Sequence, residues 1–492
     1  MDMATDTAMV RLVKGNKGLI LGSMALICFD ISAADVEFMP FVDAEYTYTS
    51  NIDQLTVLEQ SSDITTLGAG LIIDSQGNDG NLSLDYSAKK LFYSHDSERN
   101  KSYNDLSFNA DKVLVSEVQL RGDVGASIAN IASNIENNAS DDLISGNTIE
   151  TRNFVGGLSY QSNPRSYVDL NTRVNATATR NEDDEGDSNG FGVSLSLNEG
   201  DKITQLFWST NYDYATNESS SGGNRTEKHI YRQKIGMQQV DGWSPFLNFD
   251  YEDYNGQGAS DSANSSNVGP GVRYYWHQRS YAEVSYEFDL EDNDDFLRGA
   301  VYLNPTQRTT FSIDYRKRFY GDAYELALSH RNRRLTNEIS YEEEVESFGR
   351  PFFIEGNEIE EFLLYKTLSW QTSLDLRRSS ASVEIRTRSI ESLNNSASNK
   401  DSDSYGSTLE FEYNITRKVK TSLSFGYDFY EFEQGGSTTQ EDHYRNWDWT
   451  FEFELMKELT SGLSFVHQNR SSTERLSEFE EERINFNIRK EF

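Results

Sequence analysis

Residues 447–455 read WDWTFEFEL, in which every second side chain from Trp447 to Leu455 is apolar, and the residues between them are Asp, Thr or Glu. Strict alternation over such a length is typical of a β-strand with one apolar and one polar face. The same pattern recurs at residues 282–290, 405–415 and 423–429. The chain therefore belongs to the all-β class.

Strand length separates the two architectures that use such strands. Many of the alternating segments run over about 10–14 residues, whereas strands in soluble sheets most often have about 5–6. A strand of about 10 residues crosses a bilayer when it is tilted. The mean hydropathy of −0.67 agrees with this interpretation, because only every second residue of a membrane barrel must be apolar. Disorder is disfavoured, because 12% of the residues are aromatic.

The connections alternate between short turns and longer polar loops, which is the asymmetry of bacterial membrane barrels. Short turns are predicted at residues 162–165, 198–201, 241–245, 304–306 and 377–380. Longer loops are predicted at residues 130–148, 180–189, 216–225, 255–265, 346–358, 391–403, 433–440 and 470–478. Pro164, Pro245 and Pro305 fall in the short turns, where a β-ladder tolerates proline.

These patterns predict one transmembrane, antiparallel, up-and-down β-barrel over residues 35–492. The strand number should be even, with a best count of about 24 and a range of about 18–24. Barrels of about 22 strands hold a plug, whereas about 16–18 strands leave an open channel. No separate plug domain is expected before the first strand. Either some segments are not barrel strands, or loops fold inward, with 130–148 and 346–358 as candidates for a constriction loop.

The first 34 residues have the pattern of a secretory signal peptide. Three basic residues, Arg11, Lys14 and Lys17, precede the apolar stretch 18–29, and small residues follow at 32–34. The apolar stretch is too short for a membrane-spanning helix. We therefore expect residues 1–34 to direct export through the inner membrane and to be removed, together with Cys28, the only cysteine.

The last strand carries a pattern that the machinery assembling outer-membrane barrels is expected to recognise. Ile484, Phe486, Ile488 and the terminal Phe492 share one parity, whereas Lys490 stands where an apolar residue is expected. Together with the signal peptide, this pattern predicts an integral protein of the Gram-negative outer membrane, in contact with lipid and lipopolysaccharide.

If the apolar face meets lipid, the opposite face lines the lumen. The candidate lumen-lining charges are Arg316, Arg318, Arg331, Arg333, Arg386, Arg388, Glu283, Glu287, Asp314, Glu325, Glu384, Glu410 and Glu412. Opposed charged walls would orient solutes and filter them by charge. The alternative is structural, namely cross-strand ion pairing that braces a wide wall.

Other classes of function have little support in the sequence. The formal net charge of −35 argues against nucleic acid as a partner. None of the six histidines stands in a metalloprotease motif or near a GxSxG sequence. We expect no enzyme activity, no metal site and no cofactor.

Residues 41–52 read FVDAEYTYTSNI, an aromatic-rich strand that runs into a short polar motif with Asn51 and Ile52. This stretch resembles the opening of a family of outer-membrane β-barrel porins found with exopolysaccharide and capsule biosynthesis operons. Asp53 departs from the aromatic residue that the family often has next. The resemblance implies a role in moving a polysaccharide across the outer membrane beside periplasmic export proteins, and it transfers no functional residue.

Three functions remain open at this stage. The first is a conduit for exopolysaccharide or capsular polysaccharide. The second is a general porin or a porin for oligosaccharide uptake, which would show an inward constriction loop. The third is a closed structural or adhesive barrel.

Overall fold

The computed structural model describes residues 35–116, 119–134, 142–162, 165–220, 224–256, 263–277, 279–291, 294–347, 360–393, 401–434, 438–474 and 477–492. The predicted signal peptide, residues 1–34, lies outside the described residues, and so do Pro164 and most of the loop predicted at 346–358.

The described residues form 24 β-strands and one short 3-10 helix, η1 (Ser97–Arg99). The strands are β1 (Asp35–Thr49), β2 (Ser62–Gly77), β3 (Gly80–Tyr93), β4 (Lys101–Val115), β5 (Leu120–Ala132), β6 (Thr148–Gln161), β7 (Val168–Asn181), β8 (Ser188–Glu199), β9 (Leu206–Ser219), β10 (Arg225–Met237), β11 (Trp243–Gly256), β12 (Asn264–His277), β13 (Ser280–Asp289), β14 (Phe296–Thr306), β15 (Thr309–Arg318), β16 (Gly321–Asn332), β17 (Leu335–Ser347), β18 (Phe362–Asp375), β19 (Ser379–Ser392), β20 (Ser402–Asn414), β21 (Val419–Gln434), β22 (Thr438–Met456), β23 (Leu459–Ser472) and β24 (Phe479–Glu491). The predicted strand count and all-β class are confirmed.

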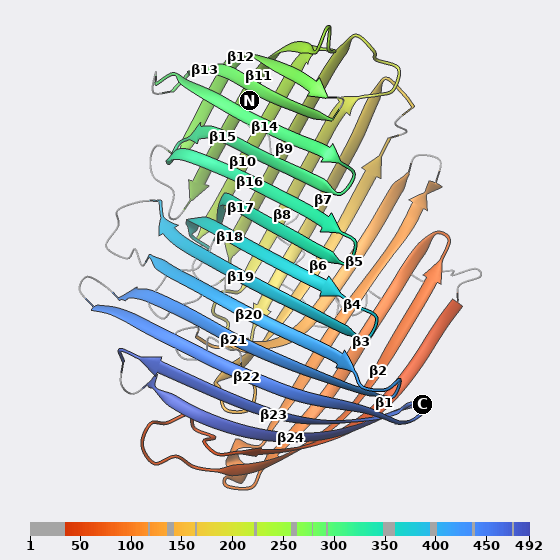
Figure 1. The fold of residues 1–492 in the computed structure, drawn as a ribbon, viewed down its shortest axis with the longest axis vertical. Helices are drawn as coiled ribbons and strands as arrows, with labels where there is room; N and C mark the ends of the chain where they lie inside the picture. Colours follow the sequence, from red (N-terminus) through yellow and green to blue (C-terminus); the bar gives the residue numbers. More distant parts are fainter. Residues whose placement is uncertain are drawn as a thin grey trace.

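The strands close into a single antiparallel barrel. Each strand pairs with the next along the chain, and β1 pairs with β24 from Phe41 opposite Glu491 to Thr49 opposite Arg483. Figure 1 shows β14 to β24 on the near wall and the earlier strands crossing behind them. Closure leaves no strand edge unpaired, which is what a barrel in hydrocarbon requires. No helix in the described part of the chain is long and apolar enough to span a membrane.

The two ends of the barrel differ in their connections. The turn end, which holds Phe492, has links such as 78–79 and 307–308, whereas the loop end has links such as 50–61 and 133–147. The predicted asymmetry is therefore present. One link at the loop end, 319–320, is as short as a tight turn, and nothing in the sequence analysis predicted it.

The prediction of turns is wrong for two prolines. Pro245 pairs with Val272 inside β11, and the turn before it is formed by Asp241 and Gly242, both with positive φ. Asp-Gly favours such a turn, because glycine accepts positive φ without strain. Pro305 lies near the end of β14 where the register shifts, and an irregularity in the ladder accommodates the missing N–H of proline.

The apolar parity of the strands points outward. Leu409, Phe411, Trp449 and Phe486 are each between 44% and 49% exposed, although each is large and hydrophobic. A soluble sheet would bury such a face. Some of the buried apolar residues of the described chain form two small clusters, one of Ile52, Ile64, Leu91, Tyr93 and Tyr103, and the other of Tyr254, Ala263, Val345, Phe362 and Leu364.

Candidate functional site: the barrel lumen

Ion pairs cover the inner face of β10 to β15. We call this region the charged lobe. Its charged residues are Arg232, Lys234, Asp250, Glu252, Arg273, Glu283, Arg298, Asp314, Arg316 and Arg318.

Several ion pairs of the charged lobe join strands that are not neighbours in the sheet. Arg318 on β15 donates to Glu252 on β11 at 2.8 Å, and both side chains are 4% exposed. Arg298 on β14 donates to Asp250 on β11 at 2.8 Å and to Asp314 on β15 at 3.2 Å. These pairs span the curve of the wall, so the inner faces of β11 and β15 must approach closely.

Further contacts narrow the lumen at its loop end. Lys228 on β10 donates to Glu344 on β17 at 3.5 Å. The amide of Asn217 on β9 donates to the hydroxyl of Ser347 at 2.8 Å. Strands β9 and β10 are separated from β17 by several strands in the sheet order, so distant parts of the barrel wall meet here. The open lumen is accordingly narrower than a ring of 24 separated strands would leave.

Six of the predicted lumen charges lie in or beside the charged lobe, and Arg318, the ion-pair partner of Glu252, is one of them. Glu283 accepts hydrogen bonds from Lys234 at 2.6 Å and from Arg273. Glu287 is 1% exposed and accepts from Asn248 at 3.1 Å. Asp314 pairs with Arg298. Glu325 stands opposite Asp314 in the β15–β16 register, and it lines one cavity together with Arg316.

The remaining candidates lie apart from the charged lobe. Arg386 on β19 pairs with Asp428 on β21 at 2.7 Å and lies 3.6 Å from Glu384. Glu410 accepts from Ser382 at 3.1 Å, and Glu412 pairs with Lys420 at 2.9 Å.

Three predicted arginines complete the set. Arg388 lies two residues beyond Arg386 on β19, Arg331 lies near the turn end of β16, and Arg333 lies in the turn after β16 with positive φ. The cluster of bases between residues 316 and 388 is therefore divided between two parts of the wall.

The residues of the expected assembly signal line the outer side of the seam between β24 and β1. Ile484, Phe486 and Ile488 stand opposite Tyr48, Tyr46 and Ala44. Phe492 is 67% exposed at the turn end, with the Lys490 ammonium 5.6 Å from the centre of its ring.

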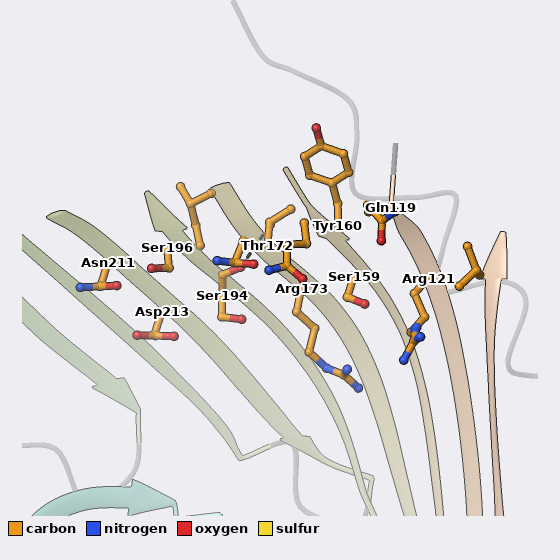
Figure 2. A pocket seen from close by; sticks show the side chains of 14 residues that line it. Gln119, Arg121, Ser159, Tyr160, Thr172, Arg173, Ser194, Ser196, Asn211 and Asp213 are labelled. Carbon is orange, nitrogen blue, oxygen red and sulfur yellow. Dashed lines mark hydrogen bonds between the residues drawn. The ribbon is translucent and has the colours of Figure 1, made fainter. Parts of the chain in front are cut away.

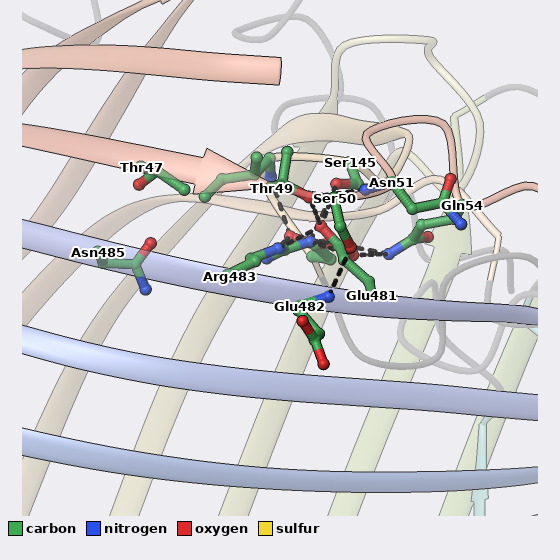
Figure 3. A network of polar contacts seen from close by, with 12 residues as sticks. Thr47, Thr49, Ser50, Asn51, Gln54, Ser145, Glu481, Glu482, Arg483 and Asn485 are labelled. Atoms are coloured by element: carbon green, nitrogen blue, oxygen red, sulfur yellow. Dashed lines mark hydrogen bonds and ion pairs between the residues drawn. The ribbon is translucent and has the colours of Figure 1, made fainter. Parts of the chain in front are cut away.

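One loop folds into the lumen. Arg483 on β24 forms an ion pair with Asp142, from the link between β5 and β6, and another with Glu481 at 2.5 Å. Gln54, in the loop after β1, donates to Asp142 at 3.0 Å. Figure 3 shows the surrounding network of polar contacts. Tyr93 donates to the carbonyl of Ile144 at 3.0 Å. The segment 142–145 is thus docked against the inner side of the barrel seam, within the loop predicted at 130–148.

A groove follows the inner wall over β5 to β10. We call it the polar groove. It consists of three adjoining cavities of about 470, 510 and 220 Å³, which share Ser194 and Asp213, and then Ala215, Asn217 and Lys228. It begins at Gln119 near the turn end and reaches Ser347 at the loop end. Figure 2 shows its first cavity, with polar side chains from successive strands.

Glycines let neighbouring side chains lie flat along the floor of the polar groove. A Cβ atom on Gly192 would stand 2.7 Å from the amide oxygen of Asn175, and one on Gly157 would stand 2.9 Å from the Arg173 guanidinium. A Cβ on Gly190 would meet Asn217 at 2.5 Å. The amides therefore cover strand β8 because β8 carries no side chain at these positions.

Sequence reasoning did not single out Glu252 or Arg298. Glu252 has the same parity as Asp250 on β11, so its inward direction could have been predicted. Arg298 lies on β14, where Phe296 and Ala300 share its face and blur the alternation. The contact between Glu252 and Arg318 depends on the curvature of the wall, and strand parity does not predict this curvature.

Burial raises the pKa of Glu360, in the link before β18, to about 7, and a hydrogen bond with Ser188 opposes this shift. Among the described residues, no group of three or more His, Cys, Asp or Glu side chains is placed to hold a metal ion.

No protein-family model and no curated protein match the chain. Solved structures resemble it at low identity. The siderophore receptor PirA from Acinetobacter baumannii is 9% identical, with a TM-score of 0.48 over 94% of this chain and 81% of that chain. The FrpB iron transporter from Neisseria meningitidis is 9% identical, with a TM-score of 0.47 over 92% and 81%.

A loop-deletion mutant of OmpT, an outer membrane protein of Vibrio cholerae, is 9% identical, with a TM-score of 0.32 over 94% of this chain and 100% of that chain. The fold assignment rests on the strand pairing of the chain itself, which closes at β1 and β24.

Proposed function

We propose that this chain is an integral pore of the Gram-negative outer membrane and carries an exopolysaccharide or capsular polysaccharide to the cell surface. The observation that carries the proposal is the division of the closed barrel wall, which exposes Leu409, Phe411 and Trp449 outside and presents amides, hydroxyls and paired charges inside. Lipid and lipopolysaccharide would contact the outer face, since apolar surface is stable there.

A sugar polymer suits the inner wall for a physical reason. Conduction requires contacts that favour entry and yet are weak enough to release the solute. Hydroxyl groups of a sugar chain exchange hydrogen bonds with Asn, Ser and Thr side chains without any chemical step. The groove from Gln119 to Ser347 offers such contacts in series.

The orientation follows from the two ends. We place the turn end, with Phe492, in the periplasm and the loop end outside the cell, because short periplasmic turns are the rule in bacterial barrels. Residues 1–34 would direct export through the inner membrane, and the barrel-assembly machinery would recognise Ile484, Phe486, Ile488 and Phe492. Periplasmic export proteins would meet the turn end.

The test is the single-channel conductance of the purified, refolded chain in a planar bilayer, before and after addition of dextran. Conductance steps that dextran blocks would support the conduit. Steps that dextran leaves unchanged would favour the general porin. A silent protein that still inserts and remains heat-modifiable would favour the closed barrel, and a protein that never enters bilayers would overturn the proposal.

One observation favours the general porin as the second candidate. The docked segment 142–145 lies where a constriction loop was expected, held by Arg483. Replacement by Arg483→Ala would release it, and a porin with this constriction would then show larger conductance steps for small ions. Arg483→Lys is the matched control, because it retains the charge near Asp142.

A further inference from the structure

We propose that the polar groove, and not the charged lobe, is the solute path, and that it accepts an uncharged, hydroxyl-rich chain. This inference rests on the proposed function and deepens it. It names the part of the wall that meets the solute and separates neutral sugars from acidic ones.

The arginines of the groove are already neutralised. Arg173 donates to Asp123 at 2.5 Å, and Arg121 lies 3.4 Å from Asp111. Lys228, at the far part of the groove, pairs with Glu344. Arg232, where the groove meets the charged lobe, pairs with Glu252, which it shares with Arg318. An acidic sugar would have to displace these carboxylates, at the cost of the existing ion pairs. An uncharged chain meets no such competition.

The surface between these pairs is made of short groups that both donate and accept. Asn175, Ser194, Ser196 and Asn211 lie on successive strands and line the first two cavities. An amide offers two donors and one acceptor oxygen, and a hydroxyl offers one donor and two lone pairs. Sugar hydroxyls have the same mixed character, so a chain that slides by one unit finds equivalent partners.

The dimensions of the groove fit a chain better than a single small molecule. The three cavities adjoin through shared residues, and together they run from Gln119 near the turn end to Ser347 at the loop end. A compact binding site would be one enclosed cavity of about 300–1,000 Å³. Here the cavities follow the strands of one wall along the barrel.

The charged lobe is unsuited to the same task. Arg318 and Glu252 are almost fully buried against each other, and Glu287 is 1% exposed. A solute could enter only by parting these walls and leaving charges without partners, which is costly in a dry environment. The lobe therefore closes part of the lumen and directs passage toward the groove.

The test compares two variants of the full chain. One variant carries both Asn175→Leu and Asn211→Leu, and the other carries Asn487→Leu alone. Leucine has the same branched arrangement of four side-chain heavy atoms as asparagine, although it is larger, and its side chain makes no hydrogen bonds. Asn487 is the matched control, because its amide lies over Gly462 on the inner wall as that of Asn175 lies over Gly192, but outside the groove.

The probe is maltohexaose, a neutral glucose oligomer, with oligogalacturonate of the same length as the acidic comparison. We expect current block by maltohexaose to weaken about tenfold in the double variant, on the order of two lost hydrogen bonds, and to stay within about twofold in the control. Oligogalacturonate should block the wild-type pore less well than maltohexaose. Equal losses in both variants, or stronger block by the acidic sugar, would overturn the inference.

Binding of maltohexaose to the detergent-solubilised protein, followed by saturation-transfer NMR, separates the two proposals. A chain that conducts no ions fails the proposed function. If that silent chain still binds maltohexaose through Asn175 and Asn211, the groove remains the sugar site. If the chain conducts ions but its binding of maltohexaose is unchanged when Asn175 and Asn211 are replaced, only the inference about the groove is contradicted.

Discussion

The charged lobe and the polar groove lie on the same barrel, and both are built from inward-facing polar residues. In the lobe, Arg318 and Glu252 are 4% exposed and join strands far apart in the sheet. In the groove, Arg173 and Asp123 pair at 2.5 Å but remain 44% and 22% exposed. The same ion pair chemistry therefore closes the lumen in one region and merely neutralises the wall in the other.

The difference teaches how a barrel of 24 strands can keep a modest pore without filling its centre. Burying paired charges between opposing walls holds those walls together, provided that every charge keeps its partners. Leaving small neutral groups on the rest of the wall preserves a wet passage. Stability and passage are thus assigned to different stretches of the wall, which meet at β10. Three comparisons and one pH experiment test this account.

The largest expected effect on stability comes from removing a buried ion pair of the charged lobe. Arg318→Ala removes the closest cation from the buried Glu252 and leaves Arg232 as its remaining ion-pair partner, which should lower the free energy of unfolding by about 3–5 kcal/mol. The measurement is urea unfolding of the refolded barrel in lipid vesicles. Arg386→Ala, which removes a half-exposed pair with Asp428, should cost no more than about 1 kcal/mol. Similar costs for both variants would contradict a special role for the buried pairs of the charged lobe.

The second prediction concerns the pH dependence of stability at the loop end of the barrel. Burial raises the pKa of Glu360 in the folded chain to about 7 from its ordinary value of 4.5, so the folded chain holds this proton more tightly than the unfolded chain does. The stability of this segment is therefore highest at low pH and falls as the pH rises between about 4.5 and 7, by up to about 3 kcal/mol.

Hydrogen exchange of the backbone near residue 360, followed from pH 4 to 8, measures this loss. Glu360→Gln should abolish the pH dependence, because the amide does not titrate. A variant that retains the full dependence would show that another group is responsible.

The third prediction uses one substitution in both regions. In the lobe, a Cβ on Gly269 would stand 2.3 Å from the backbone oxygen of Tyr286, which cannot move without shifting the strand. Gly269→Ala should therefore cost about 1–3 kcal/mol. In the groove, Gly192→Ala meets only the flexible amide of Asn175 and should cost less than about 1 kcal/mol. Urea unfolding of the two variants gives the ranking, and the reverse order would contradict it.

The smallest effect on stability should accompany a clear effect on conduction. Arg173→Ala removes a half-exposed pair, which costs at most about 1 kcal/mol, but leaves Asp123 and Asp213 in the groove without that cation. The reversal potential in a KCl gradient should then shift toward cation selectivity. Arg386→Ala, outside the groove, is the control and should shift the reversal potential less.

Much of the fold was predictable because it depends on local alternation. The parity of Trp447, Trp449 and Phe451 indicates which face is apolar, and the outward exposure of that face in the structure agrees. Strand length and the two classes of connection were sufficient for the count of 24 strands. Turn positions were less reliable, since Pro245 and Pro305 lie within strands at places that tolerate them.

The lumen was predictable only in part. Parity identified Arg318 and Glu283 as inward-facing, but their partners Glu252 and Lys234 lie on strands that are not neighbours. The docking of Asp142 onto Arg483 joins residues 341 positions apart. The alternation of apolar and polar residues along a strand does not predict such contacts.

The sequence by itself determined the class of the protein, its strand number and the polarity of each face, because a period of two is set by the geometry of each strand. Only the tertiary structure decided which charges meet, where opposite walls touch and where a groove stays open. These outcomes depend on the curvature of the closed sheet, which arises from all 24 strands together.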